Sequence, residues 1–211
     1  MIESIKRALV LAPHTDDGEI GCGGTIAKLA AKGCDVHYAA FSTCGASLPA
    51  GFPPGTLEKE VREATLRLGI RPENLRIYNY PVRRFRTHSQ DILEDLVALN
   101  QTIRPDVVFA PSQNDIHQDH STIAEEAIRA YKNKTILAYE MPWNNLIFET
   151  RGFSILSLED INKKMYALEA YESQKGREYF KAEFLKNLAA VRGAQVKTQY
   201  AEVFDVVRHI F

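Results

Sequence analysis

The sequence predicts a single α/β domain over residues 1–211, built on a Rossmann-like, doubly wound and mostly parallel sheet flanked by helices. Two observations lead to this class. Short apolar runs of strand length alternate with helical apolar spacing through the first 140 residues, which is typical of right-handed βαβ units. A chain of 211 residues, 45% hydrophobic and 25% charged, is also ordinary for one globular core.

Five strands and four helices are expected in these 140 residues. The apolar runs predict strands at residues 8–12, 36–41, 75–80, 106–110 and 135–139. Helical spacing predicts helices at residues 25–31, 57–68, 89–103 and 121–130. Thr25 is the expected N-cap of the first helix. The second helix is expected to bury Val61, Ala64, Leu66 and Leu68.

The last third of the chain is less regular. Edge strands are expected within residues 148–156, helices at 158–171 and 179–191, and a final strand at 203–207. These segments contain too few strands for a second sheet, so we assign them to the same domain.

Composition excludes several classes of partner. A formal net charge of −1 gives no basic field for nucleic acid, and no apolar run approaches the roughly 20 residues of a membrane span. The N-terminal residues lack the apolar region and cleavage site of a secretion signal, which predicts a cytoplasmic protein. Three cysteines without a C-x-x-C pair are expected to be free thiols.

A first polar cluster follows the first predicted strand. His14, Asp16 and Asp17 place one imidazole and two carboxylates within four residues. Either aspartate alone is more typical of a turn or a helix cap, but the combination indicates a functional site. The segment between residues 12 and 25 is expected to be a loop whose backbone approaches a ligand closely at Gly21, Gly23 and Gly24.

A second polar cluster follows the fourth predicted strand and contains His117, Asp119 and His120. In a doubly wound sheet of order 3-2-1-4-5, the loops after strands one and four lie side by side, and ligands bind in the crevice between them. The two clusters are therefore expected to face each other, although about 100 residues separate them.

Two imidazoles and a carboxylate suit a divalent ion such as zinc, which in catalytic sites commonly takes three protein ligands and one water. A nearby uncoordinated carboxylate would accept a proton from that water, and an imidazole would stabilise an oxyanion or protonate a leaving group. The residues thus predict metal-assisted hydrolysis of an acyl bond.

These motifs carry a family resemblance. The chain resembles the PIG-L/LmbE-like zinc-dependent N-acetylglucosaminyl de-N-acetylases in four segments. The segments are His14-Thr15-Asp16-Asp17, Glu19-Ile20-Gly21, Gly23-Gly24-Thr25 and His117-Gln118-Asp119-His120.

The resemblance implies a role for each polar residue. It implies His14, Asp17 and His120 as zinc ligands, with another divalent ion such as Fe²⁺ as the alternative. It implies Asp16 as the general base, His117 as the acid or oxyanion stabiliser, and Asp119 as the residue that orients His117. The implied reaction removes the acetyl group from a small-molecule amino-sugar conjugate, and homo-oligomers are common in the family.

Three positions depart from the family's pattern. Thr15 stands where proline is usual, and Gly18 stands where a larger or acidic residue is frequent. Leu57 aligns with an arginine that contacts the sugar, which leaves Lys59 and Arg62 as loose substitutes.

Three further segments are candidates for substrate contacts because they leave the same edge of the predicted sheet. Arg83, Arg84 and Arg86 either grip an anionic group of the substrate or form a solvated loop. Trp143 either stacks on a sugar ring or fills the core. Residues 42–56, rich in glycine and proline, are expected to border the site as a loop.

Other functions remain open at this stage. A dinucleotide site is disfavoured because Ile26 replaces the last glycine of a G-x-G-x-x-G pattern and the second strand ends without an acidic residue. The same metal site would also serve a zinc amidohydrolase of non-sugar N-acyl amides, or a degenerate protein that binds a sugar conjugate without turnover.

Overall fold

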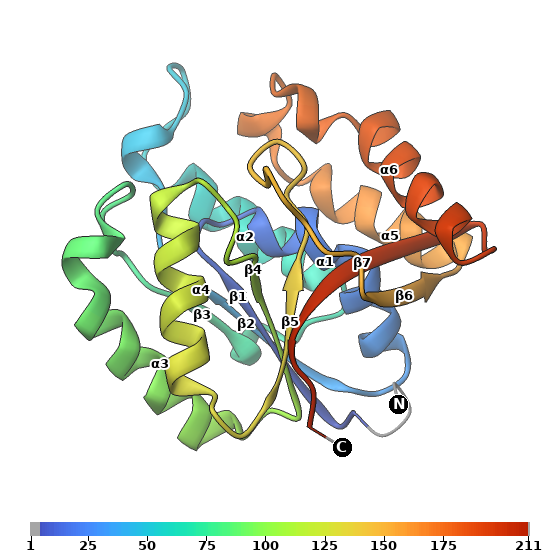
Figure 1. Ribbon diagram of the computed structural model, residues 1–211. Coiled ribbons are helices and arrows are strands. Elements are labelled where there is room, and N and C mark those ends of the chain that lie inside the picture. Colours follow the sequence, from blue (N-terminus) through green and yellow to red (C-terminus); the bar gives the residue numbers. More distant parts are fainter. Residues whose placement is uncertain (1–4, 211) are drawn as a thin grey trace.

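A seven-stranded mixed sheet forms the centre of the computed structural model, which describes residues 5–210 (Figure 1). Its strands are β1 (Arg7–Ala12), β2 (Asp35–Ala40), β3 (Leu75–Ile77), β4 (Val107–Pro111), β5 (Thr135–Tyr139), β6 (Gly152–Leu156) and β7 (Tyr200–Arg208). Their order in the sheet is β3-β2-β1-β4-β5-β7-β6. The first five strands are parallel, and β7 and β6 add an antiparallel edge. The predicted doubly wound order is confirmed.

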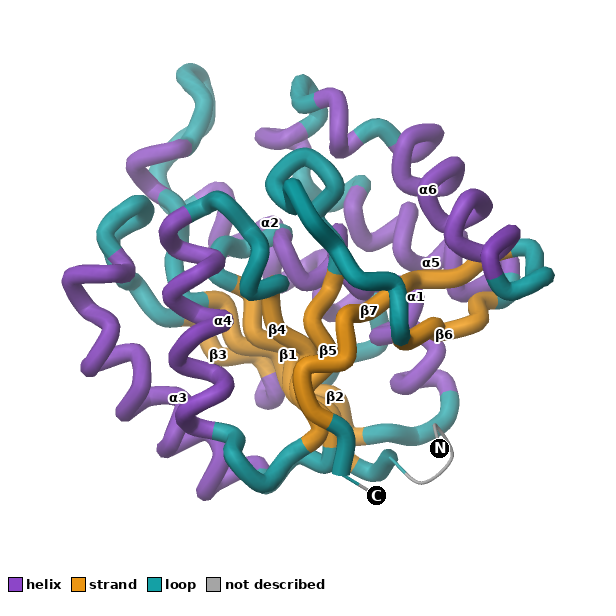
Figure 2. The backbone as a smooth tube through the Cα atoms, in the orientation of Figure 1, coloured by secondary structure: helices purple, strands orange, loops and turns teal. Residues whose placement is uncertain are grey.

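Helices cover both faces of the sheet, as expected for parallel strands (Figure 2). They are α1 (Asp17–Ala31), α2 (Thr56–Arg67), α3 (Ser89–Ile103), α4 (Gln118–Ala130), α5 (Leu158–Leu168) and α6 (Ala182–Gln195). Helix α1 packs on α5, α3 packs on α4, and α6 packs on β7. Within the described residues, no helix is both long and apolar enough to cross a membrane.

Strand β1 supplies both halves of the core because its side chains alternate between the two faces. Ala8, Val10 and Ala12 join the cluster under α1 and α2. Leu9 and Leu11 join the cluster under α3 and α4. Every residue from 8 to 12 is fully buried, so the loop that leaves this strand starts from a rigid support.

The main error in the predicted elements concerns the first helix. Helix α1 begins at Asp17 rather than at Thr25, so most of the predicted loop is helical. The helix is kinked at Cys22, where φ is −145°. Thr25 is not an N-cap: it lies inside α1, and its hydroxyl donates to Glu202.

Smaller differences follow from tertiary packing. Helix α4 starts three residues earlier than expected, at Gln118, with His117 as its N-cap. Helix α5 ends at Leu168 rather than at residue 171, and α6 begins at Ala182 rather than at residue 179, because short 3₁₀ turns occupy residues 172–174 and 178–180. Leu66 is 53% exposed and does not join the core. The three cysteines are free, as predicted.

Candidate active site

The two polar clusters meet at one cavity of about 430 Å³, at the carboxyl ends of β1 and β4. His14, Asp16 and Asp17 line it from the start of α1, and His117 and His120 line it from the start of α4. The predicted convergence is therefore confirmed. The loop at residues 42–56 borders the same cavity through Cys44 and Ser47, as expected.

Three donor atoms form a compact triangle in this cavity. His14 Nδ1 lies 3.1 Å from Asp17 Oδ2 and 3.2 Å from His120 Nε2. His120 Nε2 lies 3.1 Å from the same Asp17 oxygen. Separations of this size are those of neighbouring ligands around one tetrahedral ion with bonds of about 2.0–2.2 Å. The two nitrogens and one oxygen are a donor set that fits zinc.

A carboxylate holds the other nitrogen of each imidazole. His14 Nε2 lies 3.0 Å from Asp119 Oδ2, and His120 Nδ1 lies 2.7 Å from Asp115 Oδ2. Such partners are characteristic of metal-binding histidines, because they fix the tautomer and direct the remaining lone pair at the metal. Sequence reasoning missed Asp115, although it lies only two residues before His117 in the chain.

The electrostatics of the triangle favour a cation. Burial alone lowers the pKa of His120, but the carboxylates of Asp17 and Asp115 outweigh burial and raise it to about 10. The pKa of Asp17 lies well below its ordinary value, because the charges of His120 and His14 overcome the opposing effect of burial. Both shifts show that this site stabilises positive charge beside Asp17.

His117 stands next to the triangle, with its ring centroid 4.9 Å from that of His14 and 4.8 Å from that of His120. The potential donor atoms of these three histidines lie within 4.8 Å of one another, so they form an alternative ligand set. The triangle with Asp17 is tighter. The backbone N–H of Asp119 donates to His117 Nδ1 at 3.2 Å.

The resemblance implied that Asp119 orients His117, and the contact that the structure shows comes from the Asp119 backbone. The Asp119 carboxylate binds His14 and the backbone N–H groups of Arg83 and Phe85, rather than the His117 ring. Only the backbone of Asp119 orients His117. The carboxylate is fully buried, and its contacts tie the loop after β3 to His14 in the first polar cluster.

Asp16 is the partly buried carboxylate that stands beside the triangle and lines the cavity. Burial, followed by the neighbouring charge of Asp17, raises the pKa of Asp16 to about 6. A carboxylate with a pKa near neutrality suits proton transfer.

The GlcNAc-PI de-N-acetylase (PIG-L) family model matches residues 9–131, more than half of the chain and both polar clusters. The chain belongs to this family. An uncharacterized deacetylase, YaiS of Escherichia coli K12, is 31% identical over 178 residues, which cover 80% of this chain and 91% of that protein. This relative is named a deacetylase, as is the family, and the resemblance seen in the motifs of the chain is confirmed.

Solved structures share the fold. The N,N'-diacetylchitobiose deacetylase of Pyrococcus horikoshii superposes with a TM-score of 0.79 at 23% identity, over 98% of this chain and 85% of that one. GalB, a 4-carboxy-2-hydroxymuconate hydratase of Pseudomonas putida, gives the same TM-score and identity, over 98% of each chain. Because one fold carries two reactions, the chemistry must be argued from the side chains.

The glycines of this PIG-L motif serve packing rather than ligand approach. A Cβ atom at Gly21 would lie 2.4 Å from the ring of Tyr139, and one at Gly24 would lie 2.5 Å from Leu156 Cδ1. A Cβ atom at Gly23 would lie 3.0 Å from Lys164. The expectation of close backbone approach to a ligand is wrong, because protein side chains fill that space.

A buried network beneath the motif centres on Glu19. The hydroxyls of Tyr38 and Tyr171 both donate to its carboxyl group. Both hydroxyls also contact the carbonyl oxygen of Thr15. Burial raises the pKa of Glu19 to about 8, against the lowering effect of these hydrogen bonds. The network fixes the backbone next to Asp16 and Asp17.

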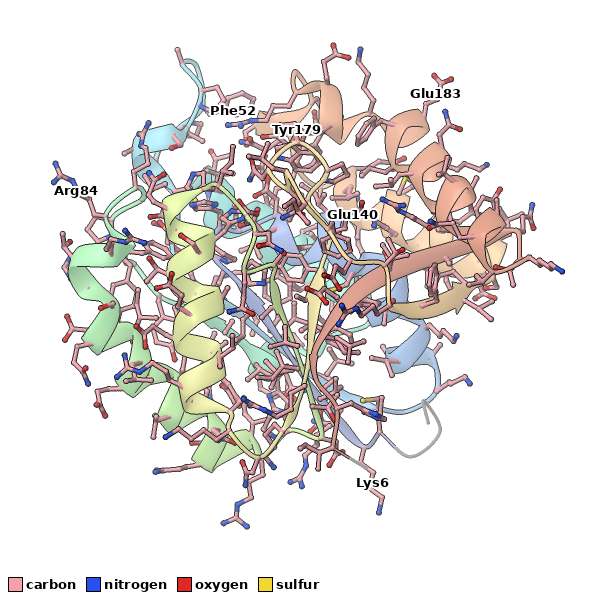
Figure 3. The ribbon with its side chains drawn as sticks, viewed as in Figure 1. Lys6, Phe52, Arg84, Glu140, Tyr179 and Glu183 are labelled. Atoms are coloured by element: carbon pink, nitrogen blue, oxygen red, sulfur yellow. The ribbon has the colours of Figure 1, made fainter. Side chains whose placement is uncertain are left out.

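The predicted basic cluster only partly reaches the cavity. Arg83 lines it. Arg84 points away from the molecule (Figure 3), and Arg86 lies 4.0 Å from Glu125 on the surface. Leu57 is buried and lines the cavity without a charge. Of its suggested substitutes, neither lines the cavity, and Arg62 pairs with Glu58.

The loop between α5 and α6 supplies cavity residues that sequence reasoning missed. Trp143 lines the cavity and stacks on Tyr179, with centroids 4.1 Å apart and planes at 16°. Tyr179, Arg177 and Gln174 line the same cavity. Tyr179 is the first residue of the helix expected at 179–191 and instead lies in a 3₁₀ turn before α6. No local pattern indicates its contact with Trp143, because the two residues are 36 positions apart.

Proposed function

We propose that this deacetylase is a zinc-dependent enzyme that removes the N-acetyl group from an amino-sugar conjugate. The observation that carries the proposal is the triangle of His14 Nδ1, Asp17 Oδ2 and His120 Nε2, with a carboxylate behind each imidazole. Zinc held by these residues would polarise the acyl carbonyl and lower the pKa of a water molecule toward about 7.

Asp16 is the proposed general base. Its carboxylate lines the cavity without belonging to the triangle, so it is free to take the proton of the attacking water. The water oxygen then bonds to the acetyl carbon, the carbon–nitrogen bond breaks, and the nitrogen takes a proton. The products are acetate and a free amine.

His117 is the proposed hydrogen-bond donor to the developing oxyanion. A backbone N–H always donates, so the contact from Asp119 makes His117 Nδ1 an acceptor. The neutral ring must then carry its proton on Nε2. That nitrogen is free to donate to the oxyanion, or to pass its proton to the leaving amine.

The amino-sugar class is supported by the family description and by the deacetylase from Pyrococcus horikoshii, which acts on diacetylchitobiose according to its name. A cavity of about 430 Å³ is large enough for a sugar ring with its acetamido group.

Acetate release by metal-stripped and zinc-restored protein tests the proposal. The panel contains N-acetylglucosaminides, N-acetylated nucleotide sugars and N-acyl amino acids. We expect release that depends on zinc from the sugar substrates, and repetition with Fe²⁺ would identify the more effective ion. Release only from N-acyl amino acids would overturn the sugar assignment. Bound zinc with no release from any substrate would overturn the hydrolytic assignment.

A further inference from the structure

Two arginines line the active-site cavity without a carboxylate partner. Within residues 5–210, no carboxylate oxygen lies within ion-pair distance of the guanidinium of Arg83 or Arg177. They come from loops on different elements, one after β3 and one between α5 and α6. Unpaired guanidinium groups in a cavity are suited to bind an anion.

Arg177 differs from the cations beside it in the chain. Lys175 pairs with Glu172, and Lys181 pairs with Glu178, so both of these surface lysines are neutralised locally. Arg177 instead lies with its guanidinium 5.7 Å from the centre of the Tyr179 ring and contacts the Tyr179 hydroxyl. Its charge stays available to the cavity.

The position of Arg177 is fixed by a stack of aromatic groups. The Tyr179 ring, over which the Arg177 guanidinium lies, is itself stacked on Trp143. The ring centroids of Trp143 and Phe184, a residue of α6, are 6.4 Å apart. Figure 3 shows Tyr179 at the upper side of the molecule, between the loop after β5 and the segment before α6. A cation held on an aromatic surface loses little further freedom when it binds a ligand.

The backbone of Arg83 is held in place by the buried Asp119 carboxylate. Its φ of +66° is in the left-handed region, and its backbone N–H donates to Asp119 Oδ2 at 2.6 Å. The same Asp119 oxygen accepts the contact with His14 Nε2. Arg83 is therefore anchored to the proposed metal-binding residues, while its side chain remains exposed at the rim.

We propose that Arg177 and Arg83 form an anion subsite, so that the enzyme selects N-acetylated amino sugars that carry a carboxylate or phosphate group. The inference rests on the proposed function for the reacting acetamido group and adds the charge of the remainder of the substrate. Among the described residues that line the cavity, Arg83 and Arg177 are the only arginines or lysines, and Leu57 adds no charge there.

Matched pairs of substrates test the subsite. N-Acetylglucosamine 6-phosphate and 1-phosphate are compared with N-acetylglucosamine, and the N-acetylglucosaminide of glycolate is compared with that of glycolamide. We expect kcat/KM to be about 10- to 100-fold higher for one anionic member, the size of a hydrogen-bonded contact to a charged group. The two arms distinguish phosphate from carboxylate. Equal kcat/KM values within every pair would overturn the proposal.

Substitutions locate the effect. Arg177→Gln is expected to abolish the preference for the anion through KM, and Arg177→Lys is expected to restore part of it. Arg84→Gln removes a positive charge next to Arg83 but outside the cavity, so it is expected to leave kcat/KM unchanged for both members of each pair. The charge of Arg177 also lowers the pKa of Asp16. An equal loss of kcat on both members of a pair would overturn the subsite and assign Arg177 to Asp16 instead.

A binding measurement separates this inference from the proposed function. Calorimetric titration with glucosamine 6-phosphate and with glucosamine needs no turnover. If glucosamine 6-phosphate binds more tightly than glucosamine, and Arg177→Gln abolishes this difference, the subsite is supported even if no substrate is deacetylated. Active enzyme with equal binding of the two amino sugars would overturn the subsite and leave deacetylation standing.

Discussion

Lys164 and Glu202 form a buried ion pair, with Lys164 Nζ 2.7 Å from Glu202 Oε1, at the kink of α1. The ammonium also donates to the carbonyl oxygen of Ile20, which ends the first half of the helix. The carboxylate accepts the backbone N–H groups of Gly24 and Thr25, which begin the second half. One charge pair from α5 and β7 thus satisfies the backbone at the break.

Replacing Lys164 by methionine is expected to destabilise the protein by about 3–5 kcal/mol, because it leaves the Glu202 charge buried without a cation. Urea unfolding followed by circular dichroism measures the loss. The neighbouring Lys163→Met is the matched control, because that side chain is 42% exposed and its pair with Glu159 is 3.8 Å long. Equal stability of the two variants would contradict a structural role for the pair.

Asp115→Asn is expected to weaken zinc binding by about 10- to 100-fold, because the carboxylate orients His120 through Nδ1. Competition with a chromogenic chelator measures the dissociation constant. Asp91→Asn, at a side chain that is 72% exposed on α3, serves as the control and should bind zinc like the parent protein. An unchanged constant in Asp115→Asn would argue against His120 as a ligand.

Asp16 and His120 should respond differently to substitution if one is the base and the other a ligand. Asp16→Asn is expected to keep one zinc per chain and lose about 10²- to 10⁴-fold in kcat. His120→Ala is expected to lose the metal first, and its activity with it. Metal analysis beside acetate release checks both, and equal loss of metal in the two variants would refute the assignment of Asp16 as base.

His117→Ala is expected to reduce kcat by about 10²- to 10³-fold without changing the metal content, since the ring stands beside the triangle and is the proposed donor to the oxyanion. Metal content and kcat are measured on the same preparation. A metal-free His117→Ala protein would instead favour His14, His117 and His120 as the ligand set.

Gly21→Ala tests the packing role of the motif glycines. The new methyl group would lie 2.4 Å from the Tyr139 ring, whose hydroxyl is fixed to the Leu11 carbonyl oxygen. We expect a loss of about 1–3 kcal/mol in unfolding free energy, which exceeds the gain in helix propensity of about 1 kcal/mol. Gly45→Ala meets nothing within 4 Å and should stay within about 0.5 kcal/mol. An unchanged unfolding free energy in Gly21→Ala would contradict the packing role of Gly21 and favour its expected role in close approach to a ligand.

The sequence by itself determined the parallel sheet, its order around β1, and the meeting of the two polar clusters. These follow from local patterns and one topological rule: apolar runs alternate with helices, and the carboxyl ends of β1 and β4 meet at the switch point. The polar clusters at those strand ends were visible in the sequence, whereas His14, Asp17 and His120 were implied as ligands by the family resemblance, and that assignment stays a prediction.

Only the tertiary structure decided which polar groups touch. The first helix starts at Asp17 because Lys164 and Glu202, far along the chain, satisfy the backbone at Cys22. Asp119 turns its carboxylate to His14, and Arg177 reaches the cavity on a ring stacked against Trp143. Such contacts join residues with no periodic relation, and a hydrogen bond depends on angstrom-scale placement that the pattern of a single chain does not encode.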